Sequence, residues 1–273
     1  NRFSDRAQIG NARERDMERL AQNFFQFFNP RYAASRHQKR FSYSIRYKVY
    51  AEELGWEPPS SSRLETDQCD DYSHHCLLEH IRSGDVAGCV RLVVPSADRT
   101  DSYLPYQLHQ IPNIASERLL QIPPADIGEI SRLAVPLHFR RRANEAGKPF
   151  ILESHSTNKI YTEEERRNFP NIAIGLYLSS IALVDLCRLK LVLVVMEPRL
   201  QRHLNRYGLR FHKISDDFEL HGKRALFELP SSELTSNMPD DIRLLYELIK
   251  QNLAQQPWQF PGTKPQLHSN EKF

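Results

Sequence analysis

The stretch ETDQCDDYSHHC, residues 65–76, combines carboxylates, imidazoles and thiols in one short segment. These groups serve metal ligation, proton transfer or nucleophilic attack. A zinc ion would draw on Cys69, Cys76, Asp70 and one histidine, yet structural zinc sites usually carry CxxC-like pairs, which this chain lacks. Adjacent histidines in a strand also point to opposite faces, so both cannot easily reach one ion. The segment therefore predicts no metal site, and its HHC half is typical of the start of a strand.

Composition favours a soluble protein with a sizeable core. The chain has 273 residues, of which 40% are hydrophobic, and a net charge of +3 from 37 basic and 34 acidic residues. This charge is too small to indicate a nucleic-acid partner. No apolar run approaches the roughly 20 residues of a membrane helix, so no transmembrane segment is expected. The N-terminus lacks a secretory signal pattern, and the cysteines suit reduced thiols, which together predict a cytoplasmic location.

Hydrophobic periodicity predicts the elements that must position the polar groups. Helices are expected at residues 12–28, 40–54, 171–188 and 240–253, with a short one from Pro198 that stops at Gly208. Strands are expected in a hairpin over 73–95 with its turn at 83–85, and then at 127–135, 191–196 and 223–229. Residues 143–170 are polar and read as a loop-like insertion. The order predicts an α/β chain with a mixed sheet and helices on both faces.

The helix at 40–54 is predicted to turn Phe41, Ile45, Val49 and Tyr50 inward.

A set of polar residues spread over these elements carries a family resemblance. The set is Arg46, Trp56, an ExDxxD pattern of Glu65, Asp67 and Asp70, then Arg91, and an ExxR pattern of Glu129 and Arg132. In this order it resembles the signature of acyl-homoserine-lactone (autoinducer) synthases. The element order, with HLNRYGLRF after the late strand, resembles the GNAT superfamily of N-acyltransferases. The stretches RYKVYAEELGWEP, GEISRLAVPLHFRRR and HGKRALFEL are more similar to N-acyl amino acid synthases and PEP-CTERM exosortase-system-associated acyltransferases.

This resemblance covers about residues 40–230 and implies a GNAT-like acyltransferase domain there. The division expected is an N-terminal helical extension at 1–39, that domain, and a C-terminal helix and tail at 231–273. The family fold implies a V-shaped gap between the parallel strands 127–135 and 191–196, which takes the pantetheine arm of the donor. It implies an acyl thioester donor on acyl carrier protein, possibly coenzyme A, and a small amine acceptor. Acyl-phosphopantetheine is then a substrate, and no permanently bound cofactor is expected.

Amide formation from a thioester needs an uncharged amine, a proton acceptor and a polarised carbonyl, but no protein nucleophile. An α-amine has a pKa near ~8, so a carboxylate must collect its proton at neutral pH. The resemblance places Glu65 and Glu129 nearest the amine, and these are the predicted catalytic residues. The predicted substrate-binding residues, among them arginine forks suited to an acceptor carboxylate, are Arg46, Trp56, Asp67, Asp70, Arg91 and Arg132. The same charges would equally neutralise one another in a buried network, and both interpretations stay open.

The basic run at Arg140, Arg141 and Arg142 stands where GNAT enzymes carry a glycine-rich loop around the coenzyme A pyrophosphate. Glycine is missing until Gly147, so the run is predicted to bind the phosphate of a phosphopantetheine arm and an acidic carrier-protein surface. A solvated basic loop is the alternative.

No GxSxG motif supports a serine nucleophile. Tyr72, Tyr207 and His221 are candidate proton donors to the leaving thiolate, although each is as easily a packed aromatic or turn residue.

The function expected is transfer of a long-chain fatty acyl group from acyl carrier protein to the amine of an amino acid or similar small acceptor. Three alternatives stay open. They are autoinducer synthesis with S-adenosylmethionine as acceptor, a coenzyme A-dependent acetyltransferase, and a non-catalytic module that binds acyl carrier protein or nucleic acid.

Overall fold

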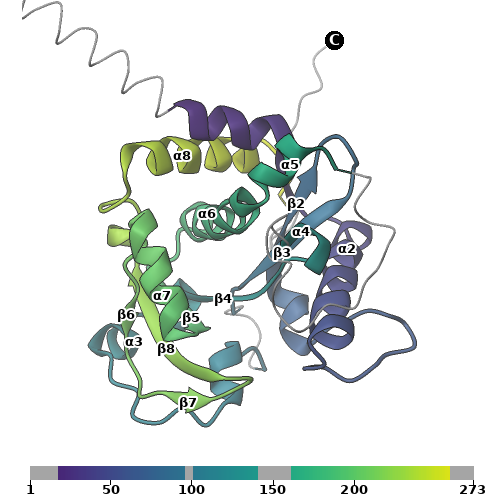
Figure 1. Cartoon of the computed structure of the whole chain (residues 1–273). Coiled ribbons are helices and arrows are strands. Elements are labelled where there is room, and N and C mark those ends of the chain that lie inside the picture. Colours follow the sequence, from purple (N-terminus) through teal and green to yellow (C-terminus); the bar gives the residue numbers. More distant parts are fainter. Residues whose placement is uncertain (1–17, 96–100, 141–160, 259–273) are drawn as a thin grey trace, which may run out of the picture.

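The fold is built around one open, twisted sheet (Figure 1). The computed structural model describes residues 18–95, 101–140 and 161–258. The eight-stranded sheet has the order β1-β2-β3-β4-β5-β8-β6, with β7 pairing β8 off this path. The strands are β1 (Phe28–Tyr32), β2 (Ser73–His80), β3 (Val86–Val93), β4 (Ile127–Ala134), β5 (Leu191–Met196), β6 (His212–Lys213), β7 (Phe218–Glu219) and β8 (Lys223–Pro230). β4 and β5 are parallel, and the other pairings in the described part are antiparallel.

Helices cover both faces of this sheet, as the sequence predicts. They are a helix over residues 18–27, α2 (Arg36–Arg46), α3 (Glu117–Gln121), α4 (Leu137–Arg140), α5 (Glu163–Asn168), α6 (Pro170–Leu186), α7 (Pro198–Leu204) and α8 (Asp240–Ala254). The apolar helix α6 lies against the sheet. In Figure 1, α8 and the first helix lie above α6. The helix α2 covers β2 and β3 from the other face and packs through a smaller core cluster that includes Val49, Leu77 and Cys89.

The helix α2 begins earlier than the predicted residue 40 because Ser35 caps it. The Ser35 hydroxyl accepts from the Gln38 N–H, and the Gln38 side chain accepts from the Ser35 N–H, which forms a capping box. A π-helical segment, Tyr47–Glu53, continues it. The prediction that Phe41 points inward is wrong, since its side chain is 46% exposed. The buried residues of α2 are Ser42 and Arg46, whose side chains hydrogen-bond to His75 and Asp70. The predicted Val49 is buried in the π-helical segment that follows.

Most other predicted elements are confirmed, including the hairpin, the strands β4, β5 and β8, and the helices α6, α7 and α8. Gly208 ends the turn after α7 at a φ of 78°, as expected for a glycine stop. The short strand β1 was not predicted, because it follows an aromatic helix directly and contains Pro30, which is tolerated at a sheet edge. Within the insertion predicted at 143–170, residues 163–168 form α5 behind a Thr162 cap, and residues 141–160 lie outside the described part.

The division into segments 1–39, 40–230 and 231–273 stays a prediction. The first of these segments supplies β1 and the last supplies α8, and both elements contribute to the largest core cluster.

The parallel strands β4 and β5 pair over a short distance and then separate. Their register runs from Ile127 opposite Leu191 to Ile130 opposite Val194, although β4 continues to Ala134. On its other edge β4 carries a bulge against β3, with Arg132 in the left-handed region at a φ of 53°. A bulge bends its strand and increases local twist, and so turns the end of β4 away from β5. The gap predicted between these strands is therefore present.

In the described residues, no helix combines the length and apolar character required to cross a bilayer.

Candidate active site

A cavity of about 770 Å3 opens where β4 and β5 part. One end is polar. Its lining includes Trp56, Glu57, Asp67, His109, Glu129, Ser131, Arg132, His221 and Arg224. The remainder is mainly apolar and lies between β5 and the helices α6 and α7. Its walls include Phe139, Ile172, Tyr177, Ile181, Val194, Leu200, Leu204 and Phe211. Such a site, apolar with a few convergent polar groups, suits an amphipathic substrate.

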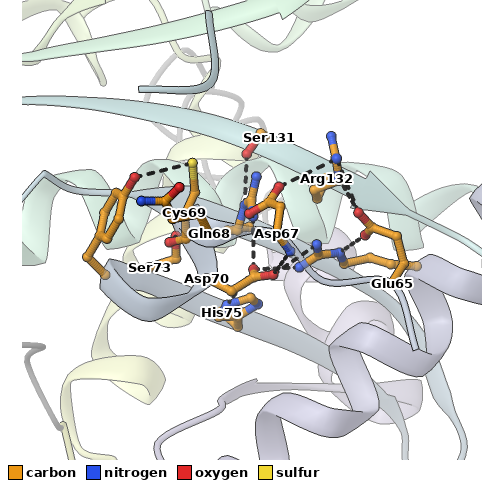
Figure 2. Close-up of polar contacts among 12 residues, drawn as sticks. Glu65, Asp67, Gln68, Cys69, Asp70, Ser73, His75, Ser131 and Arg132 are labelled. Carbon is orange, nitrogen blue, oxygen red and sulfur yellow. Dashed lines mark hydrogen bonds and ion pairs between the residues drawn. The ribbon is translucent and has the colours of Figure 1, made fainter. Parts of the chain in front are cut away.

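Beside the polar end, three arginines and three acids form a connected cluster, here called the arginine–carboxylate network (Figure 2). Its members are Arg46, Arg91, Arg132, Glu65, Asp67 and Asp70. The Arg46 side chain is 0% exposed; it donates from Nε to Glu65 and from both terminal nitrogens to Asp70, at 2.6 and 3.1 Å.

Arg91 is equally buried in this network. Its Nη1 lies 2.5 Å from Asp67 and 2.8 Å from Asp70, and its Nε donates to Ser131 at 3.1 Å. Arg132 differs because its side chain is 29% exposed. It contacts Glu65 at 3.1 Å and Asp67 at 3.5 Å. Arg46 and Arg91 are thus held deep inside, while Arg132 forms the edge of the network that borders the cavity.

Local structure explains how these groups converge. Arg46 lies in the last turn of α2, and Arg91 lies on β3 opposite Ser131 of β4. Asp67 caps a 3₁₀ turn, Gln68–Tyr72, in which the Asp70 carboxylate accepts the Asp67 N–H at 2.8 Å. The spacing of the ExDxxD pattern therefore does two things. It closes this turn, and it aims the Asp70 carboxylate at both buried arginines.

Burial and charge act in opposite directions on Asp70. Burial alone would raise the pKa of its carboxyl group, but Arg46 and Arg91 outweigh burial and hold the pKa well below its usual range. Asp70 is therefore ionised, as a bidentate partner of Arg46 must be. His75, 3.4 Å from Asp70, has a pKa well below its usual value, mainly because it is buried. It is neutral and contributes no charge to the network.

Glu129 lies on β4 beside the network and has a different environment. Its side chain is 2% exposed, it lines the cavity, and it accepts the Tyr106 N–H at 2.8 Å. Within the described residues it forms no ion pair. Burial raises the pKa of Glu129 to about 8, and the Tyr106 N–H, Arg91 and Arg132 only partly oppose this rise. A carboxyl group of this kind is mostly protonated at pH 7 and can exchange its proton near the physiological range.

The structure brings most of the predicted site residues together. The six network members adjoin one another, and Glu129 and Trp56 line the polar end of the cavity. Arg140 also lines the cavity, where it forms an ion pair with Glu53; Arg141 and Arg142 lie outside the described residues. The catalytic and binding roles of all these residues stay predictions.

Of the three candidate proton donors, Tyr207 and His221 line the cavity. Tyr72 is buried elsewhere, where its hydroxyl donates to the Tyr103 carbonyl at 3.0 Å. Sequence reasoning missed Tyr106 and His109, which come from a segment between the hairpin and β4 that matched no motif. Their sequence, PYQLHQ, has no periodic signal that would have identified them.

In the described part of the chain, no group of three or more histidine, cysteine or acidic side chains is arranged to hold a metal ion.

Comparisons with known proteins agree with this fold. Residues 45–147 match the family model described as an acetyltransferase (GNAT) domain. The crystal structure of TofI, in a ternary complex with an inhibitor and MTA, is 19% identical; the match covers 80% of this chain and 96% of TofI at a TM-score of 0.53. BjaI, a CoA-dependent acyl-homoserine lactone synthase solved with SAM and isopentyl-CoA, is 15% identical over 82% and 89% of the two chains, at a TM-score of 0.52.

FeeM, an N-acyl amino acid synthase from uncultured soil microbes, is 13% identical over 81% of this chain and 97% of FeeM. The TM-score of this match is 0.48. No curated protein sequence matches the chain significantly. The fold is thus GNAT-like, and the family match together with this fold supports an acyltransferase, as the sequence resemblance predicted.

Proposed function

We propose that this GNAT-like acyltransferase moves a long-chain fatty acyl group from acyl carrier protein to the amine of an amino acid or similar small acceptor. The observation that carries the proposal is that one cavity joins a buried carboxyl group with a raised pKa, Glu129, to long apolar walls between β5, α6 and α7. An acyl chain fits the apolar part, while the thioester and the amine meet at the polar end.

The reaction is a direct aminolysis. The amine nitrogen forms a bond to the thioester carbon, the C–S bond breaks, and the thiolate takes up a proton as it leaves. Glu129 is placed to accept the proton that the amine loses, since its pKa of about 8 is close to the ~8 of an α-amine. Tyr207, also on the cavity wall, is the proposed proton donor to the thiolate. Backbone N–H groups on the edge of β4 that faces the gap would stabilise the oxyanion.

The acceptor carboxylate is assigned to Arg132. Arg46 and Arg91 are fully buried and hold carboxylates of the protein itself, whereas Arg132 is part-exposed at the cavity edge. Of the two network acids that contact Arg132, Asp67 is the more distant, with 3.5 Å between guanidinium and carboxylate. A substrate carboxylate would replace Asp67 at this contact. Glu65 then acts mainly through Arg132 and Arg46, which it holds in place.

The carrier protein is assigned to the basic side of the cavity. Arg140 lines the cavity, and the surface around α7 carries exposed Arg199, Arg202 and Arg206. The helix α7 also supplies Leu200 and Leu204 to the apolar wall. An acidic carrier bound there would deliver its phosphopantetheine arm along the gap between β4 and β5.

A second candidate function is acyl-homoserine-lactone synthesis with S-adenosylmethionine as the acceptor. The specific observation in its favour is that Arg132 contacts three acids, Glu57, Glu65 and Asp67. Its guanidinium carbon also lies 5.8 Å from the centre of the Tyr50 ring. An acidic, aromatic edge suits a cationic acceptor.

One experiment separates these functions. The protein is incubated with acyl carrier protein that is loaded with a long acyl chain, together with either a mixture of amino acids or S-adenosylmethionine. The free thiol of the carrier and the masses of new amides are then measured. The proposal expects an N-acyl amino acid. An acyl-homoserine lactone would establish the second candidate instead, and no amide with any amine would overturn both. Replacing the donor with the matching acyl-coenzyme A tests the carrier, because equal or better turnover would refute carrier preference.

A further inference from the structure

An aromatic contact spans the polar end of the cavity from one side to the other. The Trp56 ring and the His221 ring are nearly parallel, at 9° and 4.8 Å between centroids. Trp56 follows the π-helical segment after α2, whereas His221 lies in the turn between β7 and β8. Both rings line the cavity. The contact therefore joins two segments that are far apart in the sequence and approach the site from different halves of the fold.

Each ring is anchored to its own side of the gap. On one side, Trp56 is nearly parallel to Tyr50, whose hydroxyl donates to the Leu133 carbonyl of β4 at 2.7 Å. On the other side, Arg224 donates to the His221 carbonyl at 3.3 Å and to Glu197, which directly follows β5, at 3.2 Å. The stack thus connects the β4 side of the cavity to the β5 and β8 side.

The backbone of His221 is unusual. Its φ is 50°, in the left-handed region, and Gly222 follows with a φ of 99°. Histidine tolerates this region better than most side chains, but glycine and asparagine adopt it more readily. A residue held in a sparsely populated conformation persists where its surroundings fix it, and such positions cluster at functional sites. Here the turn presents an aromatic ring to Trp56.

We propose that the Trp56–His221 contact is a gate over the acceptor end of the cavity, which opens to admit the amine and closes to keep water from the thioester. This inference rests on the proposed function, because it assigns the gate to the acceptor of that reaction. His221 acts as a positioning residue for Trp56. Water competes with the amine for the same carbon: it would form a C–O bond as the C–S bond breaks, and release a fatty acid and the carrier thiol. Closing the site over a reactive thioester suppresses this side reaction.

The test compares two substitutions at position 221. His221→Asn suits the left-handed backbone but removes the stacked ring, whereas His221→Phe keeps a flat ring at a higher backbone cost than histidine. Donor hydrolysis is measured as free carrier thiol released without any acceptor. The gate predicts an about fivefold rise for His221→Asn, as expected from the loss of one aromatic contact. It predicts a near-normal rate for His221→Phe. Lys223→Ala, in the same hairpin at an exposed position, is the matched control and should not change hydrolysis.

A second readout does not depend on catalysis. In a Trp258→Phe background Trp56 is the remaining tryptophan, since the chain has two. Acrylamide quenching of its fluorescence should be stronger in His221→Asn than in His221→Phe. Unchanged quenching, or equal hydrolysis in the two variants, would overturn the gate even if the protein makes amides. Stronger quenching in a protein that forms no amide with any acceptor would leave the closure in place and refute the proposed reaction alone.

Discussion

Glu129→Gln should strongly lower kcat and at the same time stabilise the protein at alkaline pH. The reason is the raised pKa of Glu129, about 8 in the folded protein against 4.5 for an ordinary glutamate. Below pH 4.5 both the folded and the unfolded state hold the proton, so pH has no effect. Between pH 4.5 and about 8 the unfolded state releases this proton while the folded state retains it, and stability is lost as pH rises. Above about pH 8 the loss is complete and constant.

The size of this loss follows from the same two values. Each pH unit well inside the window costs about 1.36 kcal/mol, and partial titration at both ends reduces the sum to about 3 to 4 kcal/mol between pH 5 and pH 8 for one independent group. Glutamine has nearly the same shape, keeps an oxygen for the Tyr106 N–H, and does not ionise. The difference in free energy of unfolding between Glu129→Gln and the wild type should therefore grow by about 3 to 4 kcal/mol in favour of the variant from pH 5 to pH 8.

The measurement is urea unfolding of both proteins across this pH range, with turnover measured in parallel. If Glu129 accepts the proton of the amine, kcat of the variant should fall about 10² to 10⁴-fold. The wild-type rate should rise with pH toward a plateau above about pH 8, where the carboxylate form dominates. If the free energy of unfolding changed with pH in the same way in both proteins, the pKa of Glu129 would not be raised by burial. A variant that retains kcat would show that another group accepts the proton.

Glu65→Gln is the matched control, because Glu65 is the other predicted catalytic glutamate but is paired with Arg46 and Arg132. This change leaves a buried guanidinium short of a partner and should destabilise the protein by about 3 to 5 kcal/mol.

Three further predictions concern the arginines. Arg46→Lys should lower the free energy of unfolding measured in urea, because a lysine cannot reproduce the paired contacts to Asp70 and the contact to Glu65; unchanged stability would contradict a tight buried network. In steady-state assays, Arg132→Gln should raise KM for an amino acid about 10-fold or more. It should have little effect on KM for the corresponding amine that lacks a carboxylate. Equal effects on both acceptors would argue against carboxylate binding by Arg132. Arg140→Glu should raise KM for acyl carrier protein more than for a short acyl-pantetheine, and the reverse order would count against carrier docking at this side.

The sequence predicted much of the sheet and the gathering of the polar residues. The strand β5 is a continuous apolar run, whereas β4 mixes apolar and polar residues, and their parallel pairing followed from the family resemblance. In the ExDxxD pattern, a capped 3₁₀ turn aims Asp70 at Arg46 and Arg91. Next to it, the bulged end of β4 brings Arg132 into contact with Glu65 and Asp67.

Other features could not be predicted, for physical reasons. The inward face of α2 is polar because it meets Asp70, a tertiary contact that no periodicity reveals, and so Phe41 was misplaced. Likewise, nothing in the sequence distinguishes Glu65 from Glu129 as acids. Only the structure shows that Glu65 is paired with two arginines, whereas Glu129 lines the cavity and forms no ion pair with any described residue.

The short pairing of β4 with β5 also affects how well the core of the protein is packed when no donor is bound. Four residue pairs join these strands directly before they part, and beyond them the apolar faces of α6 and α7 look onto open space. In an ordinary interior that space would hold side chains of the chain itself. In the proposed reaction the acyl chain of the donor would fill this space and become part of the hydrophobic core. The enzyme would then reach its full internal packing only while the acyl donor is bound.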